Sequence, residues 1–137
     1  MIWQLAHTMQ QQMTQELAEL GLNLPQVGAL VHIARGDVVS TADLARAVLM
    51  TPQNMSLTVA KLEAEGYVTR RPHETHGRIH RIEPTRSGLR VLAKAVAILE
   101  SVEDRMLRGL SATKRRTLVA QLRLGLDNLK EDAGRKT

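Results

Sequence analysis

The sequence predicts one mainly α-helical domain with a single small β-hairpin, and three observations point to this fold class. The chain has 137 residues, 43% of them hydrophobic, which suits one compact core and is too short for two ordinary domains. Over most of its length, apolar residues recur at spacings of three and four, the period of an amphipathic helix. Residues 67–84 differ, because two short strand-like runs flank a segment that contains Pro, Gly and His.

Two helices are expected in the first 36 residues. Gly21 ends a first helix over residues 2–20, and Asn23 can cap a second, with Gln26 as the reciprocal partner in a capping box. The first helix has an apolar stripe of Ile2, Leu5, Met9, Met13, Leu17 and Leu20. The second is expected to bury Val27, Leu30, Val31 and Ala34.

A closely spaced pair of helices is predicted between residues 40 and 66. Ser40 can cap a short helix that ends near Val48, and Asp43 follows it at the usual spacing. Thr51 as cap and Pro52 at the first helical position begin another helix, which Gly66 ends. The short turn between them is typical of a helix-turn-helix. In the second helix, Met55, Val59 and Leu62 form the apolar side, while Gln53, Asn54, Ser56, Leu57 and Lys61 lie largely on other faces.

A β-hairpin and two long helices complete the chain. The runs 67–71 and 78–84 are expected to pair as a two-stranded wing whose tip points into solvent. Thr85 can cap a long helix that Gly109 ends, and Ser111 can start the last one, with residues 131–137 expected to fray. The apolar stripes are Leu89, Leu92, Val96, Leu99, Val102 and Met106 in the first, and Leu118, Leu122, Leu126 and Leu129 in the second.

Composition excludes several classes of protein. With Trp3, Tyr67 and no Phe, the chain cannot build a surface that stacks unpaired bases on successive aromatic rings. Without Cys it has no disulfide, thiolate nucleophile or Cys-ligated metal site. No leader or 18-residue apolar run is present, so we expect a cytoplasmic protein with no membrane partner. The common catalytic motifs are also missing, and we expect neither an enzyme nor a cofactor.

Positive charge is concentrated in one part of the chain. Residues 70–90 carry six arginines against two glutamates, and so hold +4 of the chain's net charge of +5. Three of the five histidines lie in the same window. A second basic group, Lys114 to Arg116, occupies the first turn of the last helix, where it opposes the helix dipole. The positive net charge favours an anionic partner, and its concentration in residues 70–90 predicts that this partner binds beside the hairpin.

The order of elements resembles the MarR (multiple antibiotic resistance regulator) family of winged helix-turn-helix transcription factors. The resemblance covers essentially the whole chain, through LNLPQVGALVHIA, STADLARAVLMTPQNMSLTVAKLEAEGYVTRRP and GRIHRIEPTRSG, followed by two long helices. Its most specific parts are KLEAEGYVTRR and the spacing from Arg78 to Thr85 and Gly88.

The resemblance implies a homodimer that binds double-stranded DNA. Residues 1–137 would be one domain, with dimerisation helices at 1–21 and 85–131 and a DNA-binding lobe at 23–84. Each recognition helix would enter a major groove and each wing tip would approach a minor groove, on a pseudo-palindromic operator. Small phenolic or other aromatic acids, which commonly bind such proteins, would release the DNA.

Three positions depart from the family's pattern. His76 stands where an Asp usually precedes the wing arginine, and Leu57 stands where many members carry an Arg in the recognition helix. Lys114 to Arg116 replace the usual acidic start of the last helix. The operator sequence therefore does not carry over from the family.

Candidate DNA contacts divide by chemistry. Gln53, Asn54 and Ser56 can read base edges, while Arg78 at the wing tip can enter a minor groove. Hydroxyl groups at helix starts and further basic groups suit phosphates. The full set is Ser40, Thr41, Thr51, Gln53, Asn54, Ser56, Lys61, Arg70, Arg71, His76, Arg78 and Arg81.

A ligand cavity and a metal site are the remaining hypotheses for binding sites. By resemblance, residues on the helices that border the effector cavity are Trp3, His7, Met13 and His32, with Arg86 and Arg90 able to pair with a ligand carboxylate. His73, His76 and His80 could meet on the hairpin as a zinc or nickel sensor, although no Cys completes the shell.

The sequence thus predicts a dimeric DNA-binding regulator, a repressor rather than an activator, that a small effector releases from its operator. One alternative is a winged-helix module that binds another protein without specific DNA binding. The other is a metal-responsive regulator that uses the wing histidines.

Overall fold

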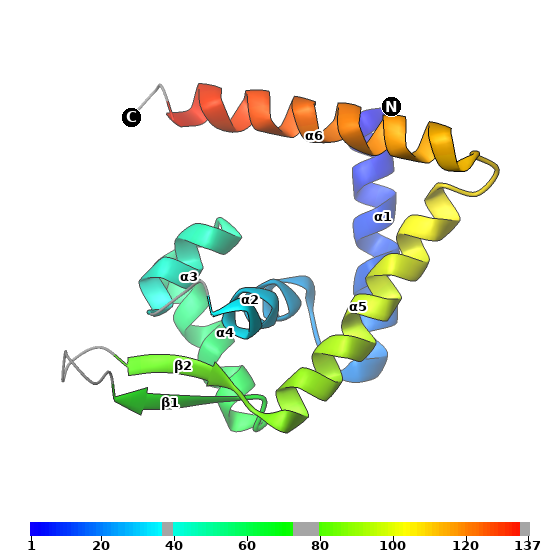
Figure 1. Ribbon diagram of the computed structural model, residues 1–137. Coiled ribbons are helices and arrows are strands. Elements are labelled where there is room, and N and C mark those ends of the chain that lie inside the picture. The colour runs from blue at the N-terminus through cyan, green and yellow to red at the C-terminus, as the bar shows by residue number, and fades with distance from the viewer. Residues whose placement is uncertain (37–39, 73–79, 135–137) are drawn as a thin grey trace. The chain divides into compact units, whose positions relative to one another are not determined.

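The computed structural model describes residues 1–36, 40–72 and 80–134, and it confirms a mainly helical fold with one hairpin (Figure 1). The chain divides into two compact units, Met1–Val102 and Glu103–Thr137. In chain order the elements are α1 (Ile2–Leu17), the 3-10 helix η1 (Ala18–Leu20), α2 (Leu24–Arg35), α3 (Thr41–Val48), α4 (Pro52–Ala64), β1 (Val68–Pro72), β2 (His80–Pro84), α5 (Arg86–Met106) and α6 (Ala112–Gly134).

The predicted helix caps are confirmed by hydrogen bonds. Asn23 Oδ1 accepts the backbone N–H of Gln26 at 2.9 Å, and Gln26 Oε1 accepts that of Asn23 at 2.8 Å, which completes the capping box of α2. Ser40 and Thr51 cap α3 and α4 in the same manner. Each cap satisfies an N–H that has no partner within its helix, so the chain starts its helices where the sequence indicates.

The core of the first unit is built from α2, α3, α4 and the hairpin. Leu30, Leu44, Met55, Leu62 and Ile82 are buried in one apolar cluster. Helix α2 contacts both α3 and α4, while β2 packs on α2 and β1 packs on α4. This packing fixes the hairpin beside the helix pair, as Figure 1 shows.

Several predicted details of the helices are wrong. The first α-helix ends at Leu17 rather than Leu20, because Ala18–Leu20 tighten into a 3-10 turn before Gly21. In α2, Ile33 is buried and Ala34 is exposed, so the buried face is rotated from the predicted one. In α5, the small Ala95 is fully buried whereas Leu89 on the predicted stripe is exposed.

The hairpin is antiparallel, and its strands lie within the predicted runs apart from one end. Val68 pairs with Pro84, Arg70 with Ile82 and Arg71 with Arg81. Tyr67 precedes the first strand, and Pro72 extends it. The predicted tip, including His73, His76 and Arg78, lies outside the described residues.

Helix α6 belongs to the second unit and exposes most of its side chains. Ser111 Oγ accepts the backbone N–H of Lys114 at 3.3 Å, as the predicted cap requires, and Arg115 Nη1 lies 3.0 Å from Asp104 Oδ1. The helix continues to Gly134, so it includes residues 131–134, where a frayed end is predicted. Within the described ranges, no helix is both long and apolar enough to cross a membrane.

Candidate DNA-binding site

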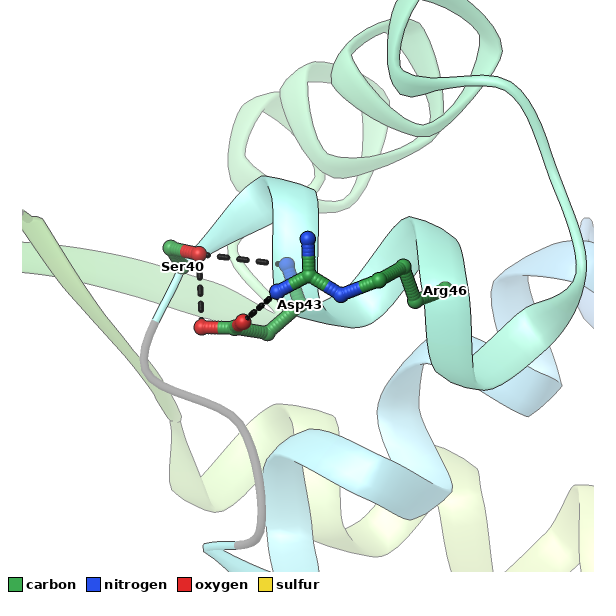
Figure 2. Close-up of polar contacts among 3 residues, drawn as sticks. All are labelled: Ser40, Asp43 and Arg46. Carbon is green, nitrogen blue, oxygen red and sulfur yellow. Dashed lines mark hydrogen bonds and ion pairs between the residues drawn. The ribbon is translucent and has the colours of Figure 1, made fainter. Parts of the chain in front are cut away.

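The start of α3 forms a small polar network (Figure 2). Ser40 Oγ accepts the N–H of Asp43 at 3.1 Å and donates its own proton to Asp43 Oδ2 at 2.7 Å. The other carboxylate oxygen of Asp43 pairs with the guanidinium of Arg46. The hydrogen bond from Ser40, and after it the charge of Arg46, hold the pKa of the Asp43 carboxyl below its ordinary value of 3.8. The Ser40 hydroxyl, which is predicted to contact a phosphate, therefore already forms hydrogen bonds with Asp43.

A tight turn joins α3 to α4. Leu49 adopts the left-handed conformation with a φ of 57°, a position that costs an L-residue with a β-carbon about 1–2 kcal/mol. The N–H of Met50 donates to the carbonyl of Ala45 at 2.9 Å and closes the end of α3. Thr51 Oγ1 then accepts the N–H of Asn54 at 3.2 Å and starts α4. The turn thus fixes where α4 begins.

The two sides of α4 differ as the helical period predicts. Met55, Val59 and Leu62 are fully buried. The opposite side is exposed and carries the predicted base-reading residues. Within the described part of the chain, no hydrogen bond engages the side-chain amides of Gln53 and Asn54. These amides are therefore available to the edges of base pairs. The exposed residues of this face are Gln53, Asn54, Ser56, Leu57, Ala60 and Lys61.

The described strands of the hairpin turn Val68, Arg70 and Ile82 to one face, and Thr69, Arg71, Arg81 and Glu83 to the other, the charged face. Val68 and Ile82 point into the core, each 3% exposed. Because neighbouring residues of a strand face opposite ways, Arg71 and Arg81 share the other face, where they are direct cross-strand partners. Glu83 lies between them, with Oε2 at 3.2 Å from Arg71 Nε and Oε1 at 3.6 Å from Arg81 Nε. The carboxylate offsets the repulsion of two opposed guanidinium groups.

A further ion pair ties the hairpin to α4. Arg70 Nε lies 3.1 Å from Glu63 Oε2 at the end of the helix. The three arginines that were predicted to contact phosphate on the strands are thus all paired with carboxylates. Sequence reasoning missed Glu63 and Glu83 as partners, because cross-strand register and the approach of β1 to α4 decide both contacts. By contrast, the ion pair between Asp43 and Arg46 on α3 could be predicted from sequence, because residues three positions apart are neighbours on a helix.

The end of the hairpin, the end of α4 and the start of α5 meet at one junction. Thr85 Oγ1 donates to the carbonyl of Gly66 at 2.6 Å and accepts the N–H of Gly88 at 2.9 Å. The N–H of Thr85 donates to the carbonyl of Tyr67 at 3.0 Å. A β-carbon on Gly88 would lie 2.0 Å from that same carbonyl oxygen. The spacing from Thr85 to Gly88 is therefore required by close packing of backbone on backbone.

The six predicted effector residues are all described. Trp3 and His7 stack on α1 with ring centroids 5.4 Å apart, and both are exposed. His7 also lines an open hollow with four polar neighbours, Gln10, Gln11, Thr14 and Gln15. Met13 on α1 and His32 on α2 are half-buried, and Arg86 and Arg90 are exposed on α5. Of the six residues, only Trp3 and His7 are shown to contact each other. The other four are distributed over α1, α2 and α5.

A metal site finds no donor set in the described part of the chain. No group of three His, Cys, Asp or Glu side chains is close enough there to hold an ion. Of the three wing histidines, His73 and His76 lie outside the described residues, and His80 is placed by its backbone pairing with Pro72. The metal hypothesis therefore remains a prediction from sequence.

Comparisons with known proteins agree with this geometry. Residues 20–79 match the model of the MarR family. Over 128 residues the chain is 29% identical to the HTH-type transcriptional repressor Rv2887 of Mycobacterium tuberculosis, which covers 93% of this chain and 92% of the relative.

Solved structures extend the likeness to the fold. The M. tuberculosis MarR family protein Rv2887 in complex with p-aminosalicylic acid matches with a TM-score of 0.76 and 27% identity, over 90% of this chain and 95% of that one. S. aureus MepR in its DNA complex shares the fold with a TM-score of 0.78 at 22% identity, over 93% and 94%.

The capped helix pair, the packed hairpin and these likenesses define a winged helix-turn-helix fold. The chain is similar to MarR family proteins over nearly its whole length. This is a family of transcriptional regulators rather than of enzymes.

Proposed function

We propose that this protein represses transcription as a homodimer that binds a pseudo-palindromic operator in double-stranded DNA. The observation that carries the proposal is the outward face of α4, where unengaged amide side chains are exposed beside a hairpin that carries arginines. Amides of this kind form paired hydrogen bonds to adenine in the major groove. We propose the cytoplasm as the site of action.

The proposed contacts follow the chemistry of each residue. Gln53, Asn54 and Ser56 read base edges, and Lys61 contacts a base or a phosphate. Arg70, Arg71 and Arg81 meet phosphates once these replace the carboxylates of Glu63 and Glu83. Ser40, Thr41 and Thr51 contribute hydroxyl groups and helix-start N–H groups to the backbone. His76 and Arg78 act at the wing tip, close to the minor groove.

Dimerisation is supported by the terminal helices. In α6, Leu122, Leu126 and Leu129 are 45–70% exposed along one stripe, and Ile2 and Trp3 on α1 are 75–76% exposed. Apolar stripes of this length on helices are normally covered by another helix. We therefore assign residues 1–21 and 85–131 to dimerisation and residues 23–84 to DNA binding, within one domain.

A small aromatic acid is the proposed effector. The relative Rv2887 is solved with p-aminosalicylic acid, a ring that carries a carboxylate. In this chain the exposed Trp3–His7 stack on α1 is a candidate partner for an aromatic ring, and Arg86 and Arg90 on α5 are separate candidate partners for a carboxylate. Binding there would release DNA by favouring a dimer whose recognition helices no longer match two successive major grooves.

The test is DNA binding by the full-length protein at two salt concentrations. Duplexes from its own upstream region and from a scrambled sequence are compared by fluorescence anisotropy. We expect preference for the upstream duplex and an affinity that falls with salt, since phosphate contacts release counterions. Equal affinity for the two duplexes at both salt concentrations would overturn the proposal.

The effector and the dimer are tested on the same complex. Addition of p-aminosalicylic acid should release the operator, and Arg86→Ala with Arg90→Ala should prevent that release at a salt concentration where the variant still binds the operator. Sedimentation should give twice the chain mass. A monomer that binds the operator tightly would contradict the assignment of α1 and α6 to dimerisation.

A further inference from the structure

Leu57 stands at the centre of the outward face of α4 and is 71% exposed. Residues three or four positions apart are neighbours on a helix surface. Leu57 therefore lies beside Gln53 and Asn54 towards the start of α4, and beside Ala60 and Lys61 towards its end. All four neighbours are exposed.

The packing of α4 does not use Leu57. The buried stripe of Met55, Val59 and Leu62 lies on the opposite side of the helix and forms its contacts with the core. Leu57 leaves most of its apolar surface in water, next to two amides and a cation. An exposed leucine surrounded by polar side chains suits a partner surface that has one apolar group with polar groups around it.

The major groove presents such a surface at A·T pairs. The thymine C5-methyl group projects into the groove, and the adenine of the same pair presents N6 and N7 to an amide side chain. Gln53 and Asn54 are one helical turn from Leu57, so an amide on adenine leaves the leucine near the methyl of the same or the next pair. Lys61, one turn further, reaches a guanine or a phosphate.

We propose that Leu57 packs against thymine methyl groups and thereby makes the protein select A·T pairs at the centre of each half-site. This inference rests on the proposed DNA-binding function and adds a specificity-determining residue to it. Ala60 contributes a smaller apolar contact on the same face.

The expected effect of one methyl contact is about fourfold in affinity, the equivalent of about 0.8 kcal/mol for one buried carbon group. The contact acts on specificity rather than on electrostatic attraction. It should therefore leave the salt dependence of binding unchanged.

The experiment begins with the selection of sites from a random duplex library by the full-length protein. Each thymine of the selected half-site is then replaced by deoxyuridine, which differs only by loss of the methyl group. For the unmodified protein we expect one or two positions at which this replacement weakens binding about fourfold. For Leu57→Ala we expect weaker binding to the thymine duplex and equal affinity for the two duplexes. The loss of the methyl effect separates a direct contact from a change in the fold.

Leu124→Ala is the matched control, because Leu124 is also an exposed helical leucine, 62% exposed, and lies off the apolar stripe of α6. It should keep the full methyl effect. An unchanged affinity at every uridine, or a methyl effect that persists in Leu57→Ala, would overturn the inference while leaving the proposed function intact. Failure to select any site would overturn the proposed function together with it.

Discussion

The outward face of α4 and the charged face of the hairpin differ in how their polar groups are engaged within the protein. On α4, the amides of Gln53 and Asn54 make no side-chain hydrogen bonds within the described residues. On the hairpin, Arg71 and Arg81 share the carboxylate of Glu83. In the proposed complex, α4 would bind a base edge directly, whereas Arg71 and Arg81 would first have to exchange the carboxylate of Glu83 for a phosphate.

The difference between unengaged amides on α4 and paired arginines on the hairpin bears separately on affinity for DNA in general and on specificity for one sequence. Phosphate contacts attract any DNA, while base contacts distinguish one sequence from another. We expect the carboxylates of Glu63 and Glu83 to reduce the attraction of the hairpin to DNA of any sequence and to leave the proposed base-reading face of α4 unaffected. In the proposed complex, we expect this to favour the operator over the large excess of other sites.

The largest effect should come from the junction that the two regions share. Gly88→Ala would place a β-carbon 2.0 Å from the Tyr67 carbonyl oxygen, which is already held by the N–H of Thr85. The backbone must shift, so we expect a loss of about 3 kcal/mol in the free energy of unfolding. Urea denaturation measures it. Gly125→Ala is the control, because its β-carbon meets nothing within 4 Å, and it should be neutral or stabilising by about 1 kcal/mol. Equal stability of the two variants would contradict the close packing at Gly88.

The caps and the two sides of α4 could be predicted from sequence, whereas contacts between elements could not. Asn23, Ser40 and Thr51 cap their helices through residues three positions away, so the signal is local. The left-handed Leu49 has no such signal, because glycine or asparagine normally takes that conformation. The burial of Ala95 in place of a larger stripe residue depends on how closely α5 approaches its neighbours.

The same limit applies to the candidate site. Helical periodicity placed Gln53 and Asn54 on the exposed side of α4, and their exposure is confirmed. Their role in DNA binding remains a prediction. The pairing of Arg71 with Glu83 depends on the register that sets Arg71 opposite Arg81, and a shift of β1 by one residue would turn Arg71 to the other face.

The next largest effect should follow from loss of a base contact. Gln53→Ala keeps a good helix former at an exposed position, so the fold should not change. We expect operator binding to weaken by about 1–3 kcal/mol, with the affinity for scrambled DNA and the salt dependence unchanged. Lys61→Ala is the contrast, because it should weaken binding to both duplexes and lower the salt slope by about one if it contacts phosphate. If anisotropy titrations show that both variants change affinity for the operator and for scrambled DNA alike, the proposal that Gln53 contacts a base and Lys61 a phosphate is contradicted.

A smaller effect of opposite sign is expected when the hairpin loses its carboxylate. Glu83→Gln would free Arg71 and Arg81, so the affinity for scrambled DNA should rise and the salt slope should steepen by about one. Operator preference should fall as a result. Glu100→Gln removes the same charge from an exposed position on α5 and serves as the control. If both variants gain affinity equally, net charge rather than the shared carboxylate is responsible.

The smallest effect should be seen at α3, where a carboxylate, that of Asp43, pairs with an arginine, Arg46, as Glu83 does with Arg71 on the hairpin. The Asp43 carboxyl has a folded-state pKa below 3.8, held there by the Ser40 hydroxyl and then by Arg46. Its ionised form therefore stabilises the fold above that value, and the contribution is lost as the pH falls through the folded pKa. Asp43→Asn should lower the stability at about pH 7 and leave it unchanged in strong acid. Urea denaturation across this range measures both. The variant also releases Arg46, so a modest gain in affinity for scrambled DNA should accompany the loss of stability, as at Glu83. A stability difference that stays constant across the pH range would show that the carboxylate charge does not act at this cap.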